Sequence, residues 1–360
     1  MIKCATITIG DELLYGNMDD TNATWLSQKL TNSGAVVSTR ITVGDSLADI
    51  QGALEVALNK ADVVILTGGL GPTQDDKTRE AIAGFCKRPL VRDEGLASSL
   101  EKHFAPRGPR VVALNEKLAW VCEGSEILPN TKGTAVGTWV EEGQGAIISL
   151  PGVPYEMKII MEEEVLPRIR SRYDVEPPFI QWIMTAGQGE SSLSVALESI
   201  EQNMPKGVVL AYLPSLQGVR LRLTSSNELA KESIKVARAI EDRLGHLVFA
   251  KENTTLSHVV HNLLVEHKIK LAFAESCTGG SIMATLVKHP GSSQYLLGGH
   301  VVYSNDWKHK EIDVKKDLLI SCGAVSEEVA RSMAEGAKAN AHSDMALAVT
   351  GIAGPEGGSP

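Results

Sequence analysis

The chain has 360 residues, of which 43% are hydrophobic and 22% charged, and this balance excludes wholesale disorder. Its 35 Lys and Arg residues against 44 Asp and Glu residues give a formal net charge of −9, which disfavours a broad surface for nucleic acid or anionic lipid. Apolar runs are far shorter than the ~20 residues of a membrane span, and the five cysteines form no CxxC pair. We expect a soluble cytoplasmic protein with reduced cysteines and roughly two or three domains.

Strand-like and helix-like segments alternate in the first third of the chain. The pattern predicts strands at 3–9, 35–42 and 62–66 and helices at 21–32 and 47–59. Thr21 and Ser46 are placed to cap the two helices. This βα repeat predicts a parallel sheet covered by helices. Residues 85–140 are less regular, and a strand at 146–150 and a helix at 155–173 follow.

Two further regions follow the proline pair at 177 and 178, which ends the helix. The first is a small α+β module, predicted as strands at 179–186, 207–212, 218–224 and 247–250 and helices at 191–200 and 227–244. The second begins with a helix at 256–264 capped by Thr254 or Thr255, and continues with strands at 269–274, 298–303 and 345–349 and helices at 278–288 and 326–341. We therefore divide the chain into domains 1–174, 175–250 and 251–360.

A glycine loop at 67–73 follows a buried strand and precedes Asp75 and Asp76. Glycines let the backbone approach a phosphate, and a carboxylate pair beside a phosphate calls for a hard divalent cation such as Mg²⁺. The loops at 10–16 and 43–45 should open onto the same edge of a parallel sheet. Each acid taken alone can equally be a helix cap or a first-turn acid, whereas three converging loops favour a site.

These loops resemble a known family. The segments GDELLYG (10–16), DTN (20–22), VGD (43–45), TGGLGPTQDDKT (67–78) and LPGVPYEMK (150–158) are similar to the molybdopterin-binding-like domain, of the MoaB/MogA type, that opens CinA proteins. The resemblance implies an ADP-ribose pyrophosphatase that yields AMP and ribose 5-phosphate. It would use Mg²⁺ or Co²⁺, with K⁺ as an additional candidate ion.

The resemblance also implies roles for single residues. Asp45 and Asp76 become the catalytic candidates, and Asp45, Asp75 and Asp76 the metal ligands, with the choice between base and ligand open. The substrate-binding candidates are Gly10, Glu12, Asn22, Thr67, Gly68, Gly69, Gly71, Thr73 and Gly133.

A serine follows the predicted strand at 269–274. Ser276 stands at a strand-to-helix turn, where a nucleophile meets the N–H groups of the next turn. The alternative is that Ser276 or Thr278 only caps the helix. No histidine has a spacing that marks it as a base, so Lys308 is the candidate, although read alone it is one of several surface lysines.

The segments AESCTGG (274–280), VVYSNDWK (301–308) and VTGIAGPEGGSP (349–360) resemble the CinA C-terminal domain, a nicotinamide-nucleotide amidase. The resemblance implies Ser276 as nucleophile and Lys308 as base, assisted by Tyr303 and Thr350. It implies deamidation of nicotinamide mononucleotide to nicotinate mononucleotide and ammonia. The implied substrate-binding residues are Thr278, Gly279, Gly280, Gly351 and Gly354, and Cys277, a rival nucleophile, is expected to pack.

Family members continue beyond the GGSP segment at 357–360 with another strand, a helix and an arginine loop. We therefore expect a C-terminally truncated α/β amidase domain with weak or absent activity in this chain.

The module at 175–250 resembles the KH-like linker domain of CinA proteins. Its GQGE segment at 187–190 is not a GxxG clamp, so we expect a spacer or dimer contact and no RNA binding. The expected partners are ADP-ribose, nicotinamide mononucleotide and a second copy of the chain, with neither nucleic acid nor membrane. Two other functions stay open: a non-catalytic regulatory protein linked to competence, and a pterin-binding module.

Overall fold

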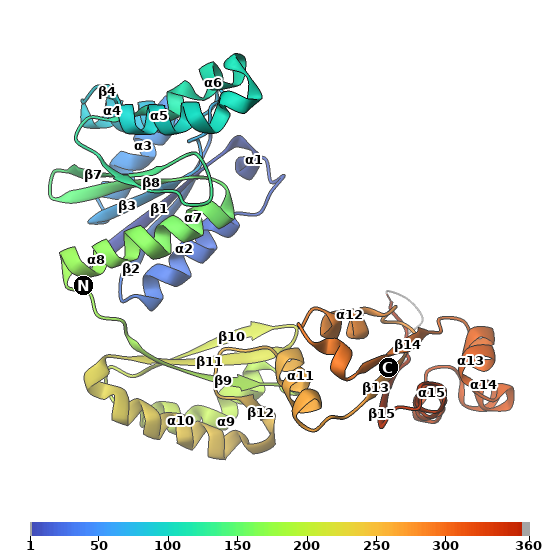
Figure 1. Cartoon of the computed structure of the whole chain (residues 1–360). Coiled ribbons are helices and arrows are strands. Elements are labelled where there is room, and N and C mark those ends of the chain that lie inside the picture. The colour runs from blue at the N-terminus through green and yellow to red at the C-terminus, as the bar shows by residue number, and fades with distance from the viewer. Residues whose placement is uncertain (1, 355–360) are drawn as a thin grey trace. The chain divides into compact units, whose positions relative to one another are not determined.

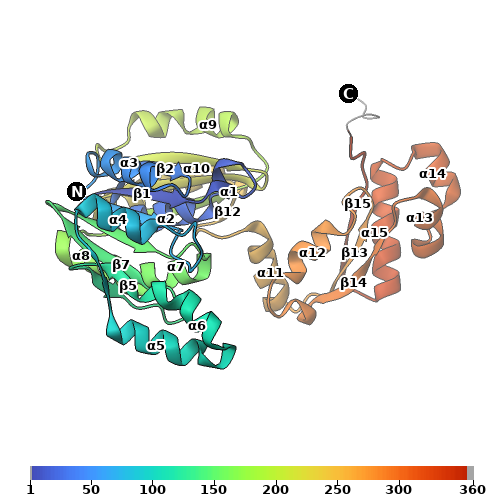
Figure 2. The same cartoon turned by 90° about the horizontal axis from the view of Figure 1, so that it is seen from above.

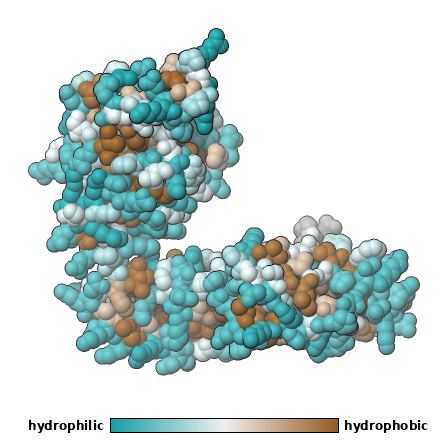
Figure 3. Space-filling view, in the orientation of Figure 1, coloured by the Kyte–Doolittle hydropathy of each residue, from teal (hydrophilic) through white to brown (hydrophobic). Residues whose placement is uncertain are grey.

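The structure is a computed structural model that describes residues 2–354 (Figure 1). Its contacts divide the chain into two compact units, residues 1–178 and 179–360. The division falls four residues after the predicted boundary at 174, and the predicted boundary at 250 lies inside the second unit. The three-domain boundaries stay a prediction. Within the described part of the chain, no helix is long and apolar enough to cross a membrane. The face seen in Figure 3 is mostly hydrophilic.

The first unit alternates strands and helices as predicted. Its elements are β1 (Lys3–Ile9), α1 (Asp11–Leu14), α2 (Thr21–Asn32), β2 (Val36–Val43), α3 (Leu47–Leu58), β3 (Val63–Thr67), α4 (Thr78–Cys86), β4 (Leu90–Arg92), α5 (Glu94–Phe104), α6 (Pro109–Asn115), β5 (Trp120–Cys122), β6 (Glu126–Leu128), β7 (Gly137–Glu142), β8 (Gly145–Leu150), α7 (Pro154–Ile160) and α8 (Leu166–Tyr173).

One sheet organises this unit, with the strand order β2-β1-β3-β8-β7-β6. The four strands from β2 to β8 are parallel, while β7 and β6 are antiparallel additions. Side chains alternate across the sheet, so Val63 and Ile65 pack with α2, α7 and α8, and Val64 and Leu66 pack with α3 and α4. Figure 1 shows these two helical layers on opposite faces of the sheet. The carboxyl ends of the parallel strands therefore share one edge.

The second unit contains two sheets. Its elements are β9 (Phe179–Thr185), α9 (Glu190–Gln202), β10 (Val209–Ser215), β11 (Gly218–Ser225), α10 (Ala230–Leu244), β12 (Val248–Ala250), α11 (Leu256–Glu266), β13 (Leu271–Glu275), α12 (Ser281–Val287), β14 (Leu296–Val301), α13 (Asn305–Ile312), α14 (Lys316–Cys322), α15 (Glu327–Ala341) and β15 (Met345–Val349).

The first of these sheets is antiparallel, in the order β10-β11-β9-β12, and packs one face on α9 and α10. The second is parallel, in the order β14-β13-β15. Helices α11 and α12 cover one face of it and α15 the other, as Figure 2 shows. The central strand β13 thus delivers its carboxyl end, and the residue that follows, to the middle of a sheet edge. The predicted α/β class with a small α+β module is confirmed.

Some local predictions were wrong. The cap of α2 is Asp20 and not Thr21, because the Asp20 carboxylate accepts the Ala23 N–H. Helix α12 starts at Ser281 and not at 278, since Gly279 and Gly280 have φ angles of 59° and 95° that break the helix. Strand β14 occupies 296–301 and not 298–303. Ser46 and Thr255 do cap α3 and α11.

Candidate active sites

The glycine loop between β3 and α4 needs glycine for steric reasons. Gly68 has a φ angle of 109°, and a Cβ there would lie 2.3 Å from the Ile9 carbonyl oxygen. Gly69 has a φ angle of 63°, and its Cβ would lie 2.3 Å from the Thr78 hydroxyl. That hydroxyl donates to the Gly68 carbonyl at 2.8 Å. The loop therefore turns tightly between the ends of β1 and β3 and the start of α4.

Asp76 braces this loop from within. Its carboxylate accepts the Gly71 N–H at 2.8 Å, the Thr73 N–H at 2.9 Å and the Thr73 hydroxyl. These N–H groups are thereby committed to Asp76 and not offered to an incoming anion. Three accepted hydrogen bonds occupy most of the capacity of the Asp76 carboxylate, which gives this residue a positioning role.

Two cations hold the same loop by its carbonyl groups. Arg79, which is 6% exposed, donates to the carbonyl of Leu70, and Lys117 donates to the carbonyls of Thr73 and Asp76. Burial lowers the pKa of Arg79 to about 10. Sequence reasoning missed both residues, because neither lies in the glycine motif.

Carboxylates from two neighbouring loops meet at the carboxyl ends of β1 and β2. The Asp45 carboxylate accepts the Asp11 N–H at 3.0 Å, and the Asp45 N–H donates to the Asp11 carboxylate at 3.4 Å. Burial first, and then the negative charges of Asp11, Glu12 and Asp75, raise the pKa of Asp45, although the Asp11 N–H opposes the shift. The predicted convergence of these loops is therefore present in the geometry.

The oxygen donors here suit a hard divalent cation, which would relieve their mutual repulsion. Residues 2–354 contain no ready-made group of three or more His, Cys, Asp or Glu side chains placed to hold a metal ion. Of the three predicted ligands, Asp75 contributes to the raised pKa of Asp45 through its negative charge. Asp76, the third predicted ligand, is engaged in the loop.

Four of the predicted substrate-binding residues line one small cavity of about 100 Å³, namely Glu12, Asn22, Thr67 and Gly68. The Asn22 amide donates to Thr67 Oγ1 at 3.3 Å and to the Gly152 carbonyl at 2.8 Å. Thr67 donates in turn to the Pro151 carbonyl at 2.9 Å. These contacts tie the loops after β3 and β8 to the start of α2.

Two other predicted residues lie outside the lining of that cavity. Gly10 is buried and donates its N–H to the Val43 carbonyl at 3.0 Å, linking the ends of β1 and β2. Gly133 lies against Glu156, where a Cβ would come within 2.0 Å of the carboxylate. Glu156 is buried and accepts the Asn130 amide at 2.6 Å, a contact that sequence reasoning missed.

The second site joins Ser276 to Lys308. Ser276 directly follows β13, and Lys308 lies one turn into α13, which starts at the cap Ser304. The Lys308 Nζ atom lies 3.0 Å from Ser276 Oγ and 3.1 Å from the Tyr303 carbonyl oxygen. Lys308 is 2% exposed and Ser276 5%. Two residues far apart in sequence thus form a buried serine–lysine pair.

The surroundings of Lys308 favour its neutral form more than water does. Burial lowers the pKa of Lys308, and only the nearby Cys277 opposes the shift. No carboxylate of residues 2–354 forms an ion pair with Lys308. A lysine in this state can accept a proton from the serine hydroxyl.

Glu275 shapes the turn that carries the serine. It is 1% exposed and accepts N–H groups of Gly280 at 2.9 Å, Ile282 at 3.2 Å and Met283 at 2.8 Å. This carboxylate, and neither Ser276 nor Thr278, caps α12, so the alternative explanation for Ser276 fails. The N–H groups of Cys277 and Thr278 donate no hydrogen bond within residues 2–354. Sequence reasoning missed Glu275.

The remaining predicted residues surround the pair unevenly. Tyr303 is 70% exposed, and its carbonyl oxygen accepts a hydrogen bond from Lys308 Nζ. The Thr350 hydroxyl donates to the Ala324 carbonyl at 2.7 Å, which fixes the end of β15. A Cβ on Gly351 would lie 3.1 Å from Cys277 Sγ, whereas a Cβ on Gly354 would have no described atom within 4 Å. The predicted GGSP segment lies outside the described residues.

Comparison with known families gives three matches in chain order. Residues 5–171 match the family described as "Probable molybdopterin binding domain", 181–250 match the CinA KH domain of damage-inducible proteins, and 253–360 match the CinA C-terminal domain. The serine–lysine pair lies in the third match and the carboxylate loops lie in the first.

Whole-chain relatives agree with this order. A competence-damage inducible protein of Caldicellulosiruptor bescii is 40% identical over 98% of this chain and 86% of the relative. A CinA-like protein of Chlorobium chlorochromatii is 38% identical over 100% of this chain and 86% of the relative. Among solved structures, a CinA protein from Thermoplasma acidophilum is 32% identical, covers 47% of this chain and 96% of its own, and has a TM-score of 0.42.

Proposed function

The chain belongs to the CinA family, and from this premise we propose that it is a hydrolase whose C-terminal domain deamidates nicotinamide mononucleotide. The observation that carries the proposal is the buried contact of 3.0 Å between Lys308 Nζ and Ser276 Oγ. A nucleophile beside a base of lowered pKa is the arrangement that acyl transfer requires.

The reaction proceeds through an acyl-enzyme. Neutral Lys308 accepts the hydroxyl proton of Ser276 as Oγ bonds to the carboxamide carbon, and the negative charge collects on the carbonyl oxygen. The N–H groups of Cys277 and Thr278 donate to that oxygen. Lys308 passes its proton to the amide nitrogen, and the C–N bond breaks to release ammonia. Water then attacks the ester with Lys308 again as base, which yields the nicotinate nucleotide and restores Ser276.

Ammonia release from nicotinamide mononucleotide tests this proposal. Ser276→Ala should abolish release, while Cys277→Ala should retain it. Loss in Cys277→Ala alone would make the cysteine the nucleophile. Because weak or absent activity is expected of this chain, the same assay is run on a chain extended beyond Pro360. Absence of release by both chains would contradict the proposed reaction.

We propose as a second function that the first domain hydrolyses ADP-ribose to AMP and ribose 5-phosphate. The supporting observation is the raised pKa of Asp45 among Asp11, Glu12 and Asp75, at an edge where Asn22 and Thr67 also lie. Asp45 and Asp75 would hold a divalent cation, Mg²⁺ or Co²⁺, which when bound neutralises charge on the pyrophosphate.

The residues that contact the glycine loop hold its backbone in place for the substrate. Asp76, Arg79 and Lys117 fix the backbone between Leu70 and Asp76, and Asn22 holds the loop after β8 against Thr67. AMP release from ADP-ribose with Mg²⁺, with Co²⁺ and with EDTA tests the proposal, and K⁺ can be added to each arm. Release that EDTA does not affect would contradict the role of the metal. Binding without release would favour a regulatory or pterin-binding module.

A further inference from the structure

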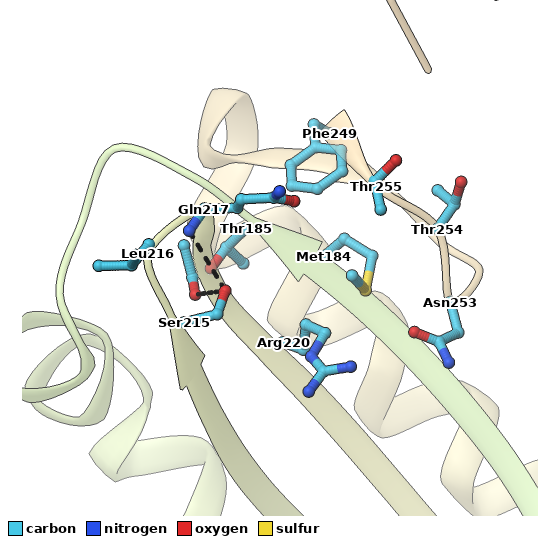
Figure 4. Close-up of a pocket in the computed structure, with 11 residues that line it drawn as sticks. Met184, Thr185, Ser215, Leu216, Gln217, Arg220, Phe249, Asn253, Thr254 and Thr255 are labelled. Carbon is cyan, nitrogen blue, oxygen red and sulfur yellow. Dashed lines mark hydrogen bonds between the residues drawn. The ribbon is translucent and has the colours of Figure 1, made fainter. Parts of the chain in front are cut away.

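A cavity lies on the antiparallel sheet and shares no lining residue with either proposed active site. It measures about 410 Å³ and is lined by the ends of β9 and β11, the β10–β11 turn, Phe249 and the segment 253–255 that leads into α11 (Figure 4). Its size is that of pockets that take small molecules.

Arg220 is the charged residue of this cavity, and no lining residue is Asp or Glu. Strand alternation places Val219 and Leu221 in the core under α9 and α10, so Arg220 projects from the opposite face of β11. In Figure 4 the Arg220 and Met184 side chains lie between the β10–β11 turn and the segment 253–255. A chain of net charge −9 thus has a cavity whose formal charge is positive.

The guanidinium of Arg220 has no partner in the described chain. Its Nε atom is buried without a hydrogen bond, and the ion pairs and hydrogen bonds of residues 2–354 do not include it. The Nε atom of neighbouring Arg222 is likewise buried without a hydrogen bond, but the Arg222 guanidinium lies over the Trp182 ring at 6.0 Å, whereas Arg220 has no such ring contact among the described residues. A buried donor left unpaired is unfavourable, and more so when it belongs to a charged group.

Some of the other polar side chains that line the cavity already form hydrogen bonds within the chain, and others do not. Thr185, Ser215 and Thr255 already bond to backbone groups of the chain. The side chains of Asn253 and Thr254 make no hydrogen bond within residues 2–354. Together with the Nη groups of Arg220, they offer several donors to one multi-oxygen anion. Phe249 and Met184 supply an apolar wall beside them.

We propose that this cavity binds a small phosphomonoester with a flat apolar part. The phosphate oxygens accept from Arg220, Asn253 and Thr254, and the flat part lies against Phe249 and Met184. A nucleoside monophosphate has this chemistry and serves as the probe. The proposal does not depend on either proposed activity, because the cavity shares no residue with the sites of Asp45 and Ser276.

Hydrogen exchange of the full chain, read at peptides covering 215–220 and 249–255, reports this cavity even when AMP also binds elsewhere. AMP should protect both segments, and inorganic phosphate and adenosine should each protect them less at equal concentration. Arg220→Gln should weaken the AMP effect by about tenfold or more, the loss expected for a charged paired hydrogen bond. The control Arg238→Gln removes an exposed arginine of α10 and should leave protection by AMP unchanged.

Three outcomes overturn the proposal. These are no protection of either segment by AMP, equal protection by adenosine and AMP, and an equal effect of the two arginine variants. If Arg220→Gln does not fold, Phe249→Leu replaces it and should weaken protection by AMP without changing that by inorganic phosphate. An unchanged AMP response in Phe249→Leu would then refute the apolar wall.

Discussion

Replacement of Lys308 by methionine removes the proposed base and keeps a long apolar stem in the buried position. The 3.0 Å contact to Ser276 is the one interaction of the Ser276 hydroxyl within residues 2–354. No second base stands within hydrogen-bond distance of that hydroxyl, so the variant leaves the nucleophile without a proton acceptor.

The size of the effect follows from general-base catalysis. A positioned base contributes about 10²–10⁴-fold, or roughly 3–5 kcal/mol of barrier, and we expect ammonia release to fall by that factor. Lys308→Arg should fall as far, because a guanidinium keeps its proton. Lys310→Met, which changes an exposed lysine of the same helix, should retain the rate.

The pH dependence gives an independent readout. Burial lowers the pKa of Lys308 from its ordinary value of 10.5, so the neutral amine forms at lower pH than in an exposed lysine. The rate should rise with pH and level off above the lowered pKa. At pH values between the lowered pKa and 10.5, Lys308 is mostly protonated in the unfolded chain and mostly neutral in the folded chain. Lys308 therefore costs stability as pH falls from 10.5 to the lowered value, and Lys308→Met should remove that slope.

The test measures initial rates of ammonia release at several pH values. Thermal unfolding of the same samples shows whether each variant is folded and how stable it is. A Lys308→Met chain that is folded and within a few-fold of the starting rate would refute the assignment of the base. A rate that falls as pH rises would refute the requirement for a neutral lysine.

Three further variants test the supporting structure. Glu275→Gln should lower ammonia release, and it should lower the free energy of unfolding by about 3 kcal/mol, because one amide oxygen replaces a carboxylate that accepts three partly buried N–H groups. Gly68→Ala should destabilise the first unit and abolish AMP release, since its Cβ would lie 2.3 Å from a backbone oxygen. At neutral pH and without divalent metal, Asp45→Asn should raise the melting temperature, because the raised pKa of Asp45 means that the folded state disfavours its ionised form. The same variant should lower AMP release.

Each of these variants has a matched control. Glu335→Gln changes an exposed acid of α15 and should be neutral, and equal losses in Glu275→Gln and Glu335→Gln would refute the capping role. Gly52→Ala, in the open middle of α3, should stabilise by about 0.5–1 kcal/mol. A Gly68→Ala chain as stable as Gly52→Ala would contradict the tight turn. Unaltered AMP release in Asp45→Asn would remove Asp45 from the proposed site.

Elements with a strong apolar period were predictable from sequence. Strands β1 and β3 match their predicted bounds within one residue, because both are central strands buried on both faces. Strand β3 is a run of apolar residues that ends at Thr67, and only Thr6 and Thr8 interrupt the apolar residues of β1 after Lys3. Helices α13 and α14 were not predicted, since both are short, and α13 is mostly polar and buries only Lys308 and Ile312. Local periodicity also misses β6 and β7, which join the sheet by antiparallel pairing across the chain.

The candidate sites were predictable only as residue types at loop ends. Ser276 and Lys308 were named from motifs, but a separation of 32 residues gives no information on whether their side chains meet. Glu275 caps α12 only because the turn folds back over its carboxylate, and no sequence-spacing rule predicts that path. Asp76 was predicted as a ligand, and its engagement with Gly71 and Thr73 depends on the loop path.

Peptide mass spectrometry of the chain quenched in acid during turnover of nicotinamide mononucleotide tests the central claim most directly. The proposed serine–lysine mechanism predicts an acyl adduct, equal in mass to the substrate less ammonia, on the peptide that contains Ser276. The adduct should persist in Cys277→Ala and vanish in Ser276→Ala. An adduct on Cys277, or turnover that proceeds unchanged in Ser276→Ala, would contradict it.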